Sequence, residues 1–174
     1  MSSIHEFKSQ LNSGTRPNRF EVVVQFPSYA GGTEEMAKTA FLVQAASYPS
    51  FNQGTIPVPF RGRQLKLAGD RTYEDWTCTI INDQGLVLRN AFEKWHNANN
   101  TINSNHMPLD IGETMSTVDI YQLNTQDERI KHYTLVLAWP TTISSVDLAQ
   151  DSNDTLSTFQ VTFAYSDLEC ENNT

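Results

Sequence analysis

Apolar and polar side chains alternate along several short stretches of the chain, which is the pattern of a strand that buries one face. In residues 19–26 the apolar positions are Phe20, Val22, Val24 and Phe26. Residues 73–81 repeat the pattern with Trp76, Cys78 and Ile80. We therefore predict a strand in each stretch and expect core positions at Phe20, Val22, Val24, Trp76, Cys78 and Ile80.

Three more stretches of this kind lie in the second half of the chain. Residues 118–123 and 130–139 lie on either side of the polar residues 125–128 and predict two more strands. Pro140 is expected to end the second of these strands, because proline donates no ladder hydrogen bond. Residues 155–165 alternate in the same way. The core positions expected from these strands are Leu135, Trp139, Phe159, Val161 and Phe163.

The region between residues 27 and 71 is less regular. A Gly31-Gly32 pair marks a loop, and the small and apolar residues 39–47 predict a strand that could form a hairpin with 19–26. Prolines then recur at positions 49, 57 and 59, which places residues 49–66 in an extended loop or at a sheet edge. A turn is expected at residues 68–71.

One long helix is predicted at about residues 83–97, where apolar residues recur at i, i+3, i+4 and i+7. Its stripe consists of Leu88, Ala91, Phe92 and Trp95, and the last two are expected in the core. Residues 101–116 are polar and predict a loop. Residues 1–18 form an N-terminal arm whose helical segment is too short to be stable alone, so it should dock on another surface, such as a neighbouring subunit.

These elements together predict a single, mainly β domain over residues 1–174. Its expected architecture is an antiparallel β-barrel or sandwich of about six to seven strands, with one amphipathic helix on its flank. Such a sheet must close or stack in order to hide its edges.

Charge and composition narrow the function classes. The 174-residue chain has twelve Lys and Arg against twenty Asp and Glu, a formal net charge of −8. Proteins that hold nucleic acid need basic side chains to displace counterions, so this balance argues against DNA gripping. The two cysteines form no CxxC motif and indicate a reducing compartment. We expect a soluble protein with no signal peptide and no membrane span.

Candidate chemistry is sparse. The four histidines have no zinc-binding spacing, and no nucleotide-binding or nucleophile motif is present. Glu74 and Asp75 are the densest carboxylates, but adjacent residues of a strand point to opposite faces. The run at 151–154 begins like a calcium loop yet lacks the required glycine and distal glutamate. We therefore expect no enzyme, no cofactor and no metal.

A specific resemblance begins at residues 57–60 and continues through 63–77, which read RQLKLAGDRTYEDWT. This stretch resembles the tail tube proteins of contractile-tailed, myovirus-type bacteriophages. The segment AGDRT, followed by an aromatic residue, two acids and Trp76, is the most specific part. Matches elsewhere keep the same order along the chain: Arg16-Pro17-Asn18 with Phe20, Trp139-Pro140-Thr141, Asp151-Ser152-Asn153, and Thr158-Phe159.

The resemblance implies a structural subunit in which six protomers form a ring and rings stack into a tube. The implied partners are further copies of the chain, the tail sheath protein, baseplate tube-initiating proteins, the tail terminator, the tape measure protein, and double-stranded DNA held loosely in the lumen. It also implies a place in the virion tail after assembly in the cytoplasm of the host bacterium.

Residues 49–66 are a candidate arm between rings, with a solvated edge hairpin as the alternative. Four of the twelve basic residues lie in or beside this segment. The contact candidates are Arg61, Arg63, Lys66, Asp70 and Arg71. Because DNA must slide through a tube, we also expect an electronegative lumen.

Three other functions stay open on the sequence. The chain could be the tube protein of a phage-derived contractile injection system or of a type VI-like secretion system. It could also be a terminator or tube initiator that stops at one ring. A β-sandwich carbohydrate-binding module is the alternative of another class, and it predicts a monomer with an exposed aromatic cleft.

Overall fold

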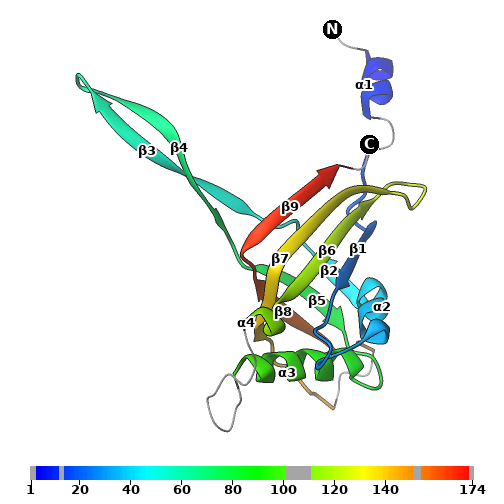
Figure 1. Cartoon of the computed structure of the whole chain (residues 1–174). Coiled ribbons are helices and arrows are strands. Elements are labelled where there is room, and N and C mark those ends of the chain that lie inside the picture. The colour runs from blue at the N-terminus through cyan, green and yellow to red at the C-terminus, as the bar shows by residue number, and fades with distance from the viewer. Residues whose placement is uncertain (1–2, 12–13, 101–110, 151–153, 173–174) are drawn as a thin grey trace.

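A seven-stranded antiparallel sheet forms the body of the protein in a computed structural model that describes residues 3–11, 14–100, 111–150 and 154–172 (Figure 1). Hydrogen-bonded neighbours follow the order β1, β6, β7, β8, β5, β2, and β9 also pairs with β7. The strands are β1 Phe20–Val24, β2 Val43–Ala46, β5 Trp76–Ile81, β6 Ser116–Leu123, β7 Arg129–Ile143, β8 Thr158–Ala164 and β9 Asp167–Asn172. The predicted fold class, a mainly β antiparallel protein with a flanking helix, is confirmed.

Strand β7 joins the two halves of this sheet. Its first half pairs with β9 and its second half with β8, and the register continues across the break: Val136 faces Asp167 and Trp139 faces Ala164. The expectation that Pro140 ends the strand is wrong, because β7 continues to Ile143. The register shifts between Pro140 and Thr142, and such an irregularity accommodates a residue without an N–H donor.

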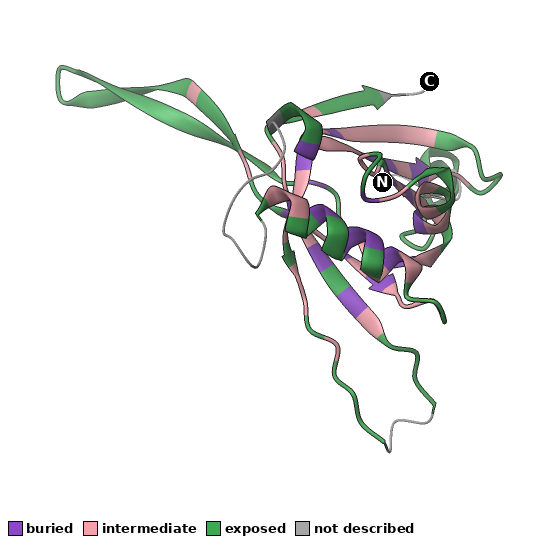
Figure 2. Cartoon of the chain, turned by 60° about the horizontal axis from the view of Figure 1, so that its bottom comes forward, coloured by how far each residue is buried: buried purple, intermediate pink, exposed green. Residues whose placement is uncertain are grey.

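The core lies between the inner faces of the sheet and the helix that covers them (Figure 2). Of the positions expected there, the buried ones are Val22, Val24, Trp76, Cys78, Ile80, Phe92, Trp95, Leu135, Phe159, Val161 and Phe163. Phe20 is partly exposed and packs against this cluster. Trp139 is only partly buried, which corrects its expected core position. Leu137 has a positive φ of 54°, which breaks the alternation, and Ala138 and Pro140 are buried instead.

Residues 33–42 form a helix, so the strand predicted at 39–47 is largely wrong. Helix α2 spans Thr33–Leu42, and only Val43–Ala46 forms a strand, which pairs with β5 and not with β1. The Gly32 N–H donates to the Glu35 carboxylate at 2.8 Å and caps the helix. The buried Thr39 hydroxyl accepts a hydrogen bond from the Val24 N–H, which fixes the helix on β1.

The long predicted helix is α3, Val87–Asn99, and it buries the predicted stripe. Asp83 caps it by accepting from the Val87 N–H at 2.9 Å. At its far end the Trp95 indole N–H donates to the Thr114 carbonyl at 2.6 Å. Thr114 ends the short helix α4, Ile111–Thr114, which corrects part of the loop predicted at 101–116. The rest of that loop, 101–110, lies outside the described residues, as do the calcium-loop residues 151–153.

The N-terminal arm carries helix α1, Ile4–Leu11, which projects from the body and buries no residue (Figure 1). A reciprocal pair of bonds between Ser3 and Glu6 caps it. Its apolar residues Ile4, Phe7 and Leu11 are all exposed. The arm therefore presents an apolar stripe that the rest of the protomer does not cover.

We predict that the two cysteines differ sharply in reactivity. Burial raises the pKa of the Cys78 thiol to about 12, so at pH 8 only about one such thiol in ten thousand is ionised. Cys170 is exposed. Because the thiolate is the reactive form, a thiol reagent should label one cysteine of the folded, unassembled chain and two after unfolding. Equally fast labelling of both in the folded chain would contradict this packing.

Candidate assembly surfaces

The most prominent projection is a two-stranded hairpin that the seven-stranded sheet does not include (Figure 1). Strands β3, Phe51–Phe60, and β4, Arg63–Tyr73, pair along their full length. The extended arm predicted at 49–66 is therefore one strand and part of a second. The turn predicted at 68–71 is wrong, because these residues lie within β4.

The hairpin turns at Arg61 and Gly62, whose φ angles are 46° and 79°. Two successive positive φ values define the type I′ turn, whose twist matches that of paired strands. A glycine at the second position meets this requirement without strain. The turn thus places Arg61 at the tip, with Arg63 next to it at the start of β4.

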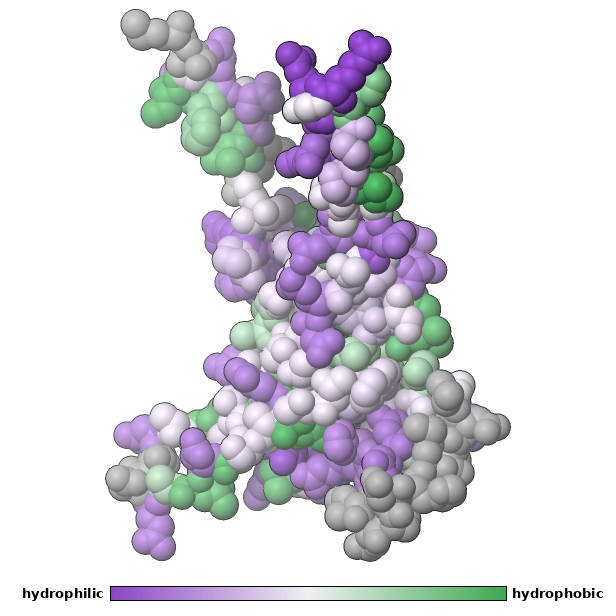
Figure 3. Space-filling view, turned by 90° about the vertical axis from the view of Figure 1, so that its left-hand side faces the viewer, coloured by the Kyte–Doolittle hydropathy of each residue, from purple (hydrophilic) through white to green (hydrophobic). Residues whose placement is uncertain are grey.

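One face of the hairpin is apolar and uncovered. Directly opposite residues share a face, and the facing pairs are Ile56 with Leu67, Val58 with Leu65 and Phe60 with Arg63. Phe60 is 66% exposed and Leu65 is 60% exposed. In Figure 3 the hairpin is the upper right projection, with hydrophobic side chains along one side and hydrophilic ones at its tip. An apolar patch of this kind marks an interaction surface.

The other face and the outer edge of the hairpin are of a different character. The opposite face carries Thr55, Pro57, Pro59, Gln64, Lys66 and Ala68. Pro57 and Pro59 have no N–H group, and in a paired strand such residues occupy the positions that point away from the partner. The outer edge of β3 is therefore a poor template for another strand. The apolar face is therefore the better candidate for a contact surface.

The structure places all five contact candidates on this hairpin. Arg61 lies over the Phe60 ring at 5.3 Å and Arg71 over the Phe51 ring at the same distance. Arg63 and Lys66 are exposed along β4, and Asp70 lies nearer the body. The alternating signal that would have revealed the apolar face is present at residues 56–60 and 65–67, but in the sequence it looks like a core pattern.

A bulge divides the hairpin at Gly54 and Gly69. The register shifts between Gln53 and Thr55, and a Cβ added to Gly69 would lie 3.1 Å from the Gly54 backbone. Such an approach is tighter than a side chain tolerates without a shift of the backbone. The glycine of the AGDRT segment therefore has a structural role, since it lets the two strands pass closely at the bend.

Hydrogen bonds fix the root of the hairpin to the body. The Glu74 carboxylate accepts from Ser50 at 2.7 Å and from Asn52 at 2.8 Å. The Tyr73 hydroxyl donates to Asp167 at 2.8 Å, which holds the pKa of that carboxyl below its ordinary value. Tyr165 donates to the Ser50 carbonyl at 3.3 Å. Glu74 thus joins the two strands at the root, while the bonds of Tyr73 and Tyr165 connect the root to the body.

A second surface, the outer face of β1, β6, β7 and β9, is acidic. Its carboxylates follow from the strand registers and are Glu21, Asp119, Asp167, Glu169 and Glu171. Arg129 pairs with Glu21 at 2.8 Å and lies over the Tyr121 ring. Asp119 is nearly buried and accepts from Thr134 at 2.9 Å, while the His132 ring lies 2.9 Å from it. On β9, Glu169 and Glu171 are exposed.

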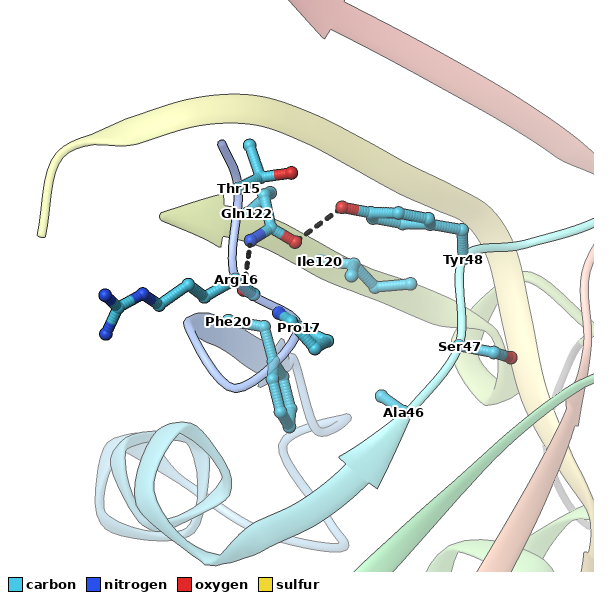
Figure 4. Close-up of a pocket in the computed structure, with 9 residues that line it drawn as sticks. All are labelled: Thr15, Arg16, Pro17, Phe20, Ala46, Ser47, Tyr48, Ile120 and Gln122. Carbon is cyan, nitrogen blue, oxygen red and sulfur yellow. Dashed lines mark hydrogen bonds between the residues drawn. The ribbon is translucent and has the colours of Figure 1, made fainter. Parts of the chain in front are cut away.

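A pocket of about 280 Å³ lies where the N-terminal arm meets the sheet (Figure 4). The Gln122 amide donates to the Arg16 carbonyl at 3.1 Å and the Arg19 carbonyl at 2.8 Å, and its oxygen accepts from Tyr48. Burial raises the pKa of Tyr48, so its phenol stays protonated as the donor. These bonds seat the Arg16-Pro17-Asn18 segment on the body, which gives the pocket a structural role.

Within the described residues, no three His, Cys, Asp or Glu side chains are grouped so that they could hold a metal ion. Trp76 and Trp95 are buried and cannot stack on a sugar. No helix in the described part of the chain is long and apolar enough to cross a membrane.

Comparison with known proteins identifies the class. The family described as phage tail tube protein matches residues 15–171, which include the hairpin, the sheet and α3. The chain therefore belongs to the phage tail tube protein family, as the resemblance at 57–77 indicated. It is 28% identical over 168 residues to the tail tube protein of Serratia phage KSP90, covering 95% of each chain. It is 30% identical over 150 residues to tail tube protein gp19 of Enterobacteria phage T4, covering 86% of this chain and 87% of that protein.

Solved structures with this fold come from contractile injection systems. The sheath–tube complex of an extracellular contractile injection system, PVC, contains a chain with a TM-score of 0.66 at 16% identity, covering 99% of both chains. The tube-terminating cap of the anti-feeding prophage gives a TM-score of 0.65 at 19% identity, covering 91% of both chains. At these identities the likeness shows the fold alone.

Proposed function

We propose that the chain is the repeating, non-catalytic subunit of a phage tail tube. Copies form hexameric rings, and rings stack into a hollow tube that lies inside a contractile sheath and conducts genomic DNA into the host. The observation that carries this proposal is the apolar face of the β3–β4 hairpin, which lies on a projection and has no cover within the protomer. Such a surface requires a partner, and a tube subunit supplies one in every adjacent copy.

The partners follow from the same assembly. Structures of this fold come from a sheath–tube complex, a baseplate and a terminator. They support a sheath protein, a baseplate initiator and a tail terminator as partners of this tube, and the resemblance adds a tape measure protein and DNA in the lumen. The chain would act in the virion tail after assembly in the host cytoplasm. A tube of a phage-derived injection system is the second candidate, and these same structures favour it.

Reversing both charges at the hairpin tip should block tube growth and leave the protomer folded. The interface between two stacked hexameric rings contains six copies of each subunit contact. An exposed ion pair contributes about 0.5 kcal/mol to such an interface. Losing one such pair per subunit removes about 3 kcal/mol per interface, on the order of a hundredfold in affinity. Arg61→Glu with Arg63→Glu should therefore raise the concentration needed for tubes by at least that factor, as measured by sedimentation and negative-stain electron microscopy.

The matched control for this variant is Arg61→Lys with Arg63→Lys, which keeps both charges. It should form tubes close to the wild-type concentration, and circular dichroism should show the same fold in both variants. Normal tubes from the Glu variant would contradict a role for the hairpin between rings.

The acidic outer face of β1, β6, β7 and β9 is our candidate for the lumen wall. Repetition around a ring multiplies its negative charge, so DNA phosphates are repelled and the duplex can slide. We predict that wild-type tubes do not retain DNA at physiological salt, while Glu169→Lys with Glu171→Lys tubes do. Filter retention of labelled duplex measures this, and Glu128→Lys on the β6–β7 turn is the control. Retention by wild-type tubes would contradict the assignment.

A further inference from the structure

Helix α1 lies outside the part of the chain that matches the tail tube family. The match covers residues 15–171, while α1 spans Ile4–Leu11. Its exposed apolar side chains recur at i, i+3 and i+7, so Ile4, Phe7 and Leu11 form one stripe along the helix. Capping bonds support the helix, yet eight residues are too few for a helix to be stable alone in water. The stripe therefore needs a surface that covers it.

An apolar hollow lies at the seam between the two ends of the sheet. Strands β1 and β2 are the first and last in the hydrogen-bonded order, and they are in contact without being paired with each other. The hollow has a volume of about 600 Å³, and Phe41, which is 86% exposed, lies on its lining. Apart from Asn18 and Gln44, the residues that line it are apolar. Folded proteins cover an open sheet edge of this kind with a helix or a loop.

The hollow continues toward the root of the N-terminal arm. Pro17, Phe20 and Ala46 also line the neighbouring 280 Å³ pocket, which reaches Tyr48. Figure 4 shows Pro17 and Phe20 between the arm root and β2. The two hollows together form a trough from Phe41 to Tyr48, which we call the seam trough. The four residues of β2 span about 13 Å, and an eight-residue helix is about 12 Å long, so α1 and the trough match in length.

The N-terminal arm directs α1 away from the seam trough of its own chain. The Arg16 carbonyl is held by the Gln122 amide at 3.1 Å. Gly14, with a φ of 62°, donates its N–H to the Leu11 carbonyl at 2.8 Å and ends the helix. In this arrangement α1 extends past the end of the sheet, although the arm root itself borders the trough (Figure 1). The trough that α1 fills therefore belongs to another copy.

We propose that α1 of one copy docks in the seam trough of a second copy of this chain, a contact that rests on the proposed tube function. The stripe of Ile4, Phe7 and Leu11 covers Phe41 and the exposed edge of β2. Helix and trough are different surfaces of the protomer, so each copy gives one helix and receives one. This exchange of arms adds an apolar contact between subunits that lies outside the residues matched by the family.

Polar replacement of the stripe should weaken assembly without unfolding the protomer. Phe7→Gln with Leu11→Gln keeps good helix formers and removes two apolar side chains. Because α1 buries no residue, the unfolding midpoint should not change. The concentration at which assembly begins in sedimentation should rise about tenfold or more, since apolar burial is lost. His5→Gln with Ser9→Gln, at the same spacing on the other side of the helix, should assemble like the wild type.

A double-mutant cycle tests whether the trough is the receptor. Phe41→Gln should raise the assembly concentration as the stripe variant does. Adding it to Phe7→Gln with Leu11→Gln should cause little further loss, because the two changes remove the same contact. Losses that multiply as independent effects would overturn docking at the seam, as would normal assembly of the stripe variant.

A cross-link separates exchange between copies from docking within one chain. Phe7→Cys and Phe41→Cys, introduced together in a Cys170→Ser chain, should give covalent dimers and higher oligomers when assembled protein is treated with a short bis-maleimide. Ser9→Cys with Phe41→Cys is the control and should give far fewer. Cross-links confined to single chains would overturn the exchange and leave the tube function intact. Failure of the wild-type chain to form rings or tubes would instead defeat the proposed function.

Discussion

Replacing Phe92 by alanine is expected to lower the free energy of unfolding by about 3–5 kcal/mol, because a large buried side chain is removed and a cavity remains. Phe92 is fully buried at the centre of an aromatic cluster. Its ring centroid lies 4.9 Å from that of Phe26, 6.2 Å from that of Phe159 and 5.9 Å from that of Phe163. Phe92 of α3 therefore packs both against Phe26, which follows β1, and against two rings of β8.

Chemical denaturation followed by tryptophan fluorescence measures this loss. Domains of this size have a total stability of about 5–15 kcal/mol, so the Phe92→Ala chain should be marginal and should fail to assemble for that reason. Lys94→Ala is the matched control on the exposed side of the same helix, and its change should stay within about 0.5 kcal/mol. A loss below 1 kcal/mol for Phe92→Ala would show that α3 does not close the core.

Polar replacement on the apolar face of the hairpin should have the opposite profile, with assembly lost and stability kept. Val58 and Leu65 face each other across the strands and are exposed in the protomer. Threonine keeps the preference for strand, so Val58→Thr with Leu65→Thr should leave the unfolding midpoint nearly unchanged. In the tube these side chains would be buried, and burial of a full side chain stabilises association by about 1.5–3 kcal/mol. The variant loses this stabilisation in every subunit of a ring.

The control for this variant lies on the other face of the same hairpin. Gln64→Thr with Ala68→Thr introduces the same side chain at positions that point away from the apolar face. Sedimentation should find tubes in the control and only rings or protomers in the Val58/Leu65 variant. Equal tube yields from the two would show that the apolar face is not the contact surface.

Period-two alternation predicted the strands that bury one face of the sheet. In β5 and β8 every second residue is buried, so the sequence carries the signal that the fold uses. The strand predicted at residues 39–47 was wrong because a short run of small and apolar residues fits a helix as well as a strand. In the structure these residues form a helix on β1, and the Thr39 hydroxyl accepts from the Val24 N–H there.

The proposed assembly surface was predicted only by its charges. Arg61, Arg63 and Lys66 were identified from the basic, proline-rich segment, and they do lie on one hairpin. Gly69 looked like a turn residue because glycine is common in turns, but it marks a bulge opposite Gly54. The apolar face at Ile56 and Val58 was missed because a strand pattern does not distinguish a core of the same chain from a contact with another chain.

The central claim, that this chain builds a tail tube, is tested most directly by negative-stain electron microscopy of the purified wild-type protein over a range of concentrations. We expect six-fold rings at low concentration and hollow tubes of constant width as the concentration rises, with or without a baseplate seed. A protein that stays monomeric well above micromolar concentration, even with baseplate extract added, would contradict the account.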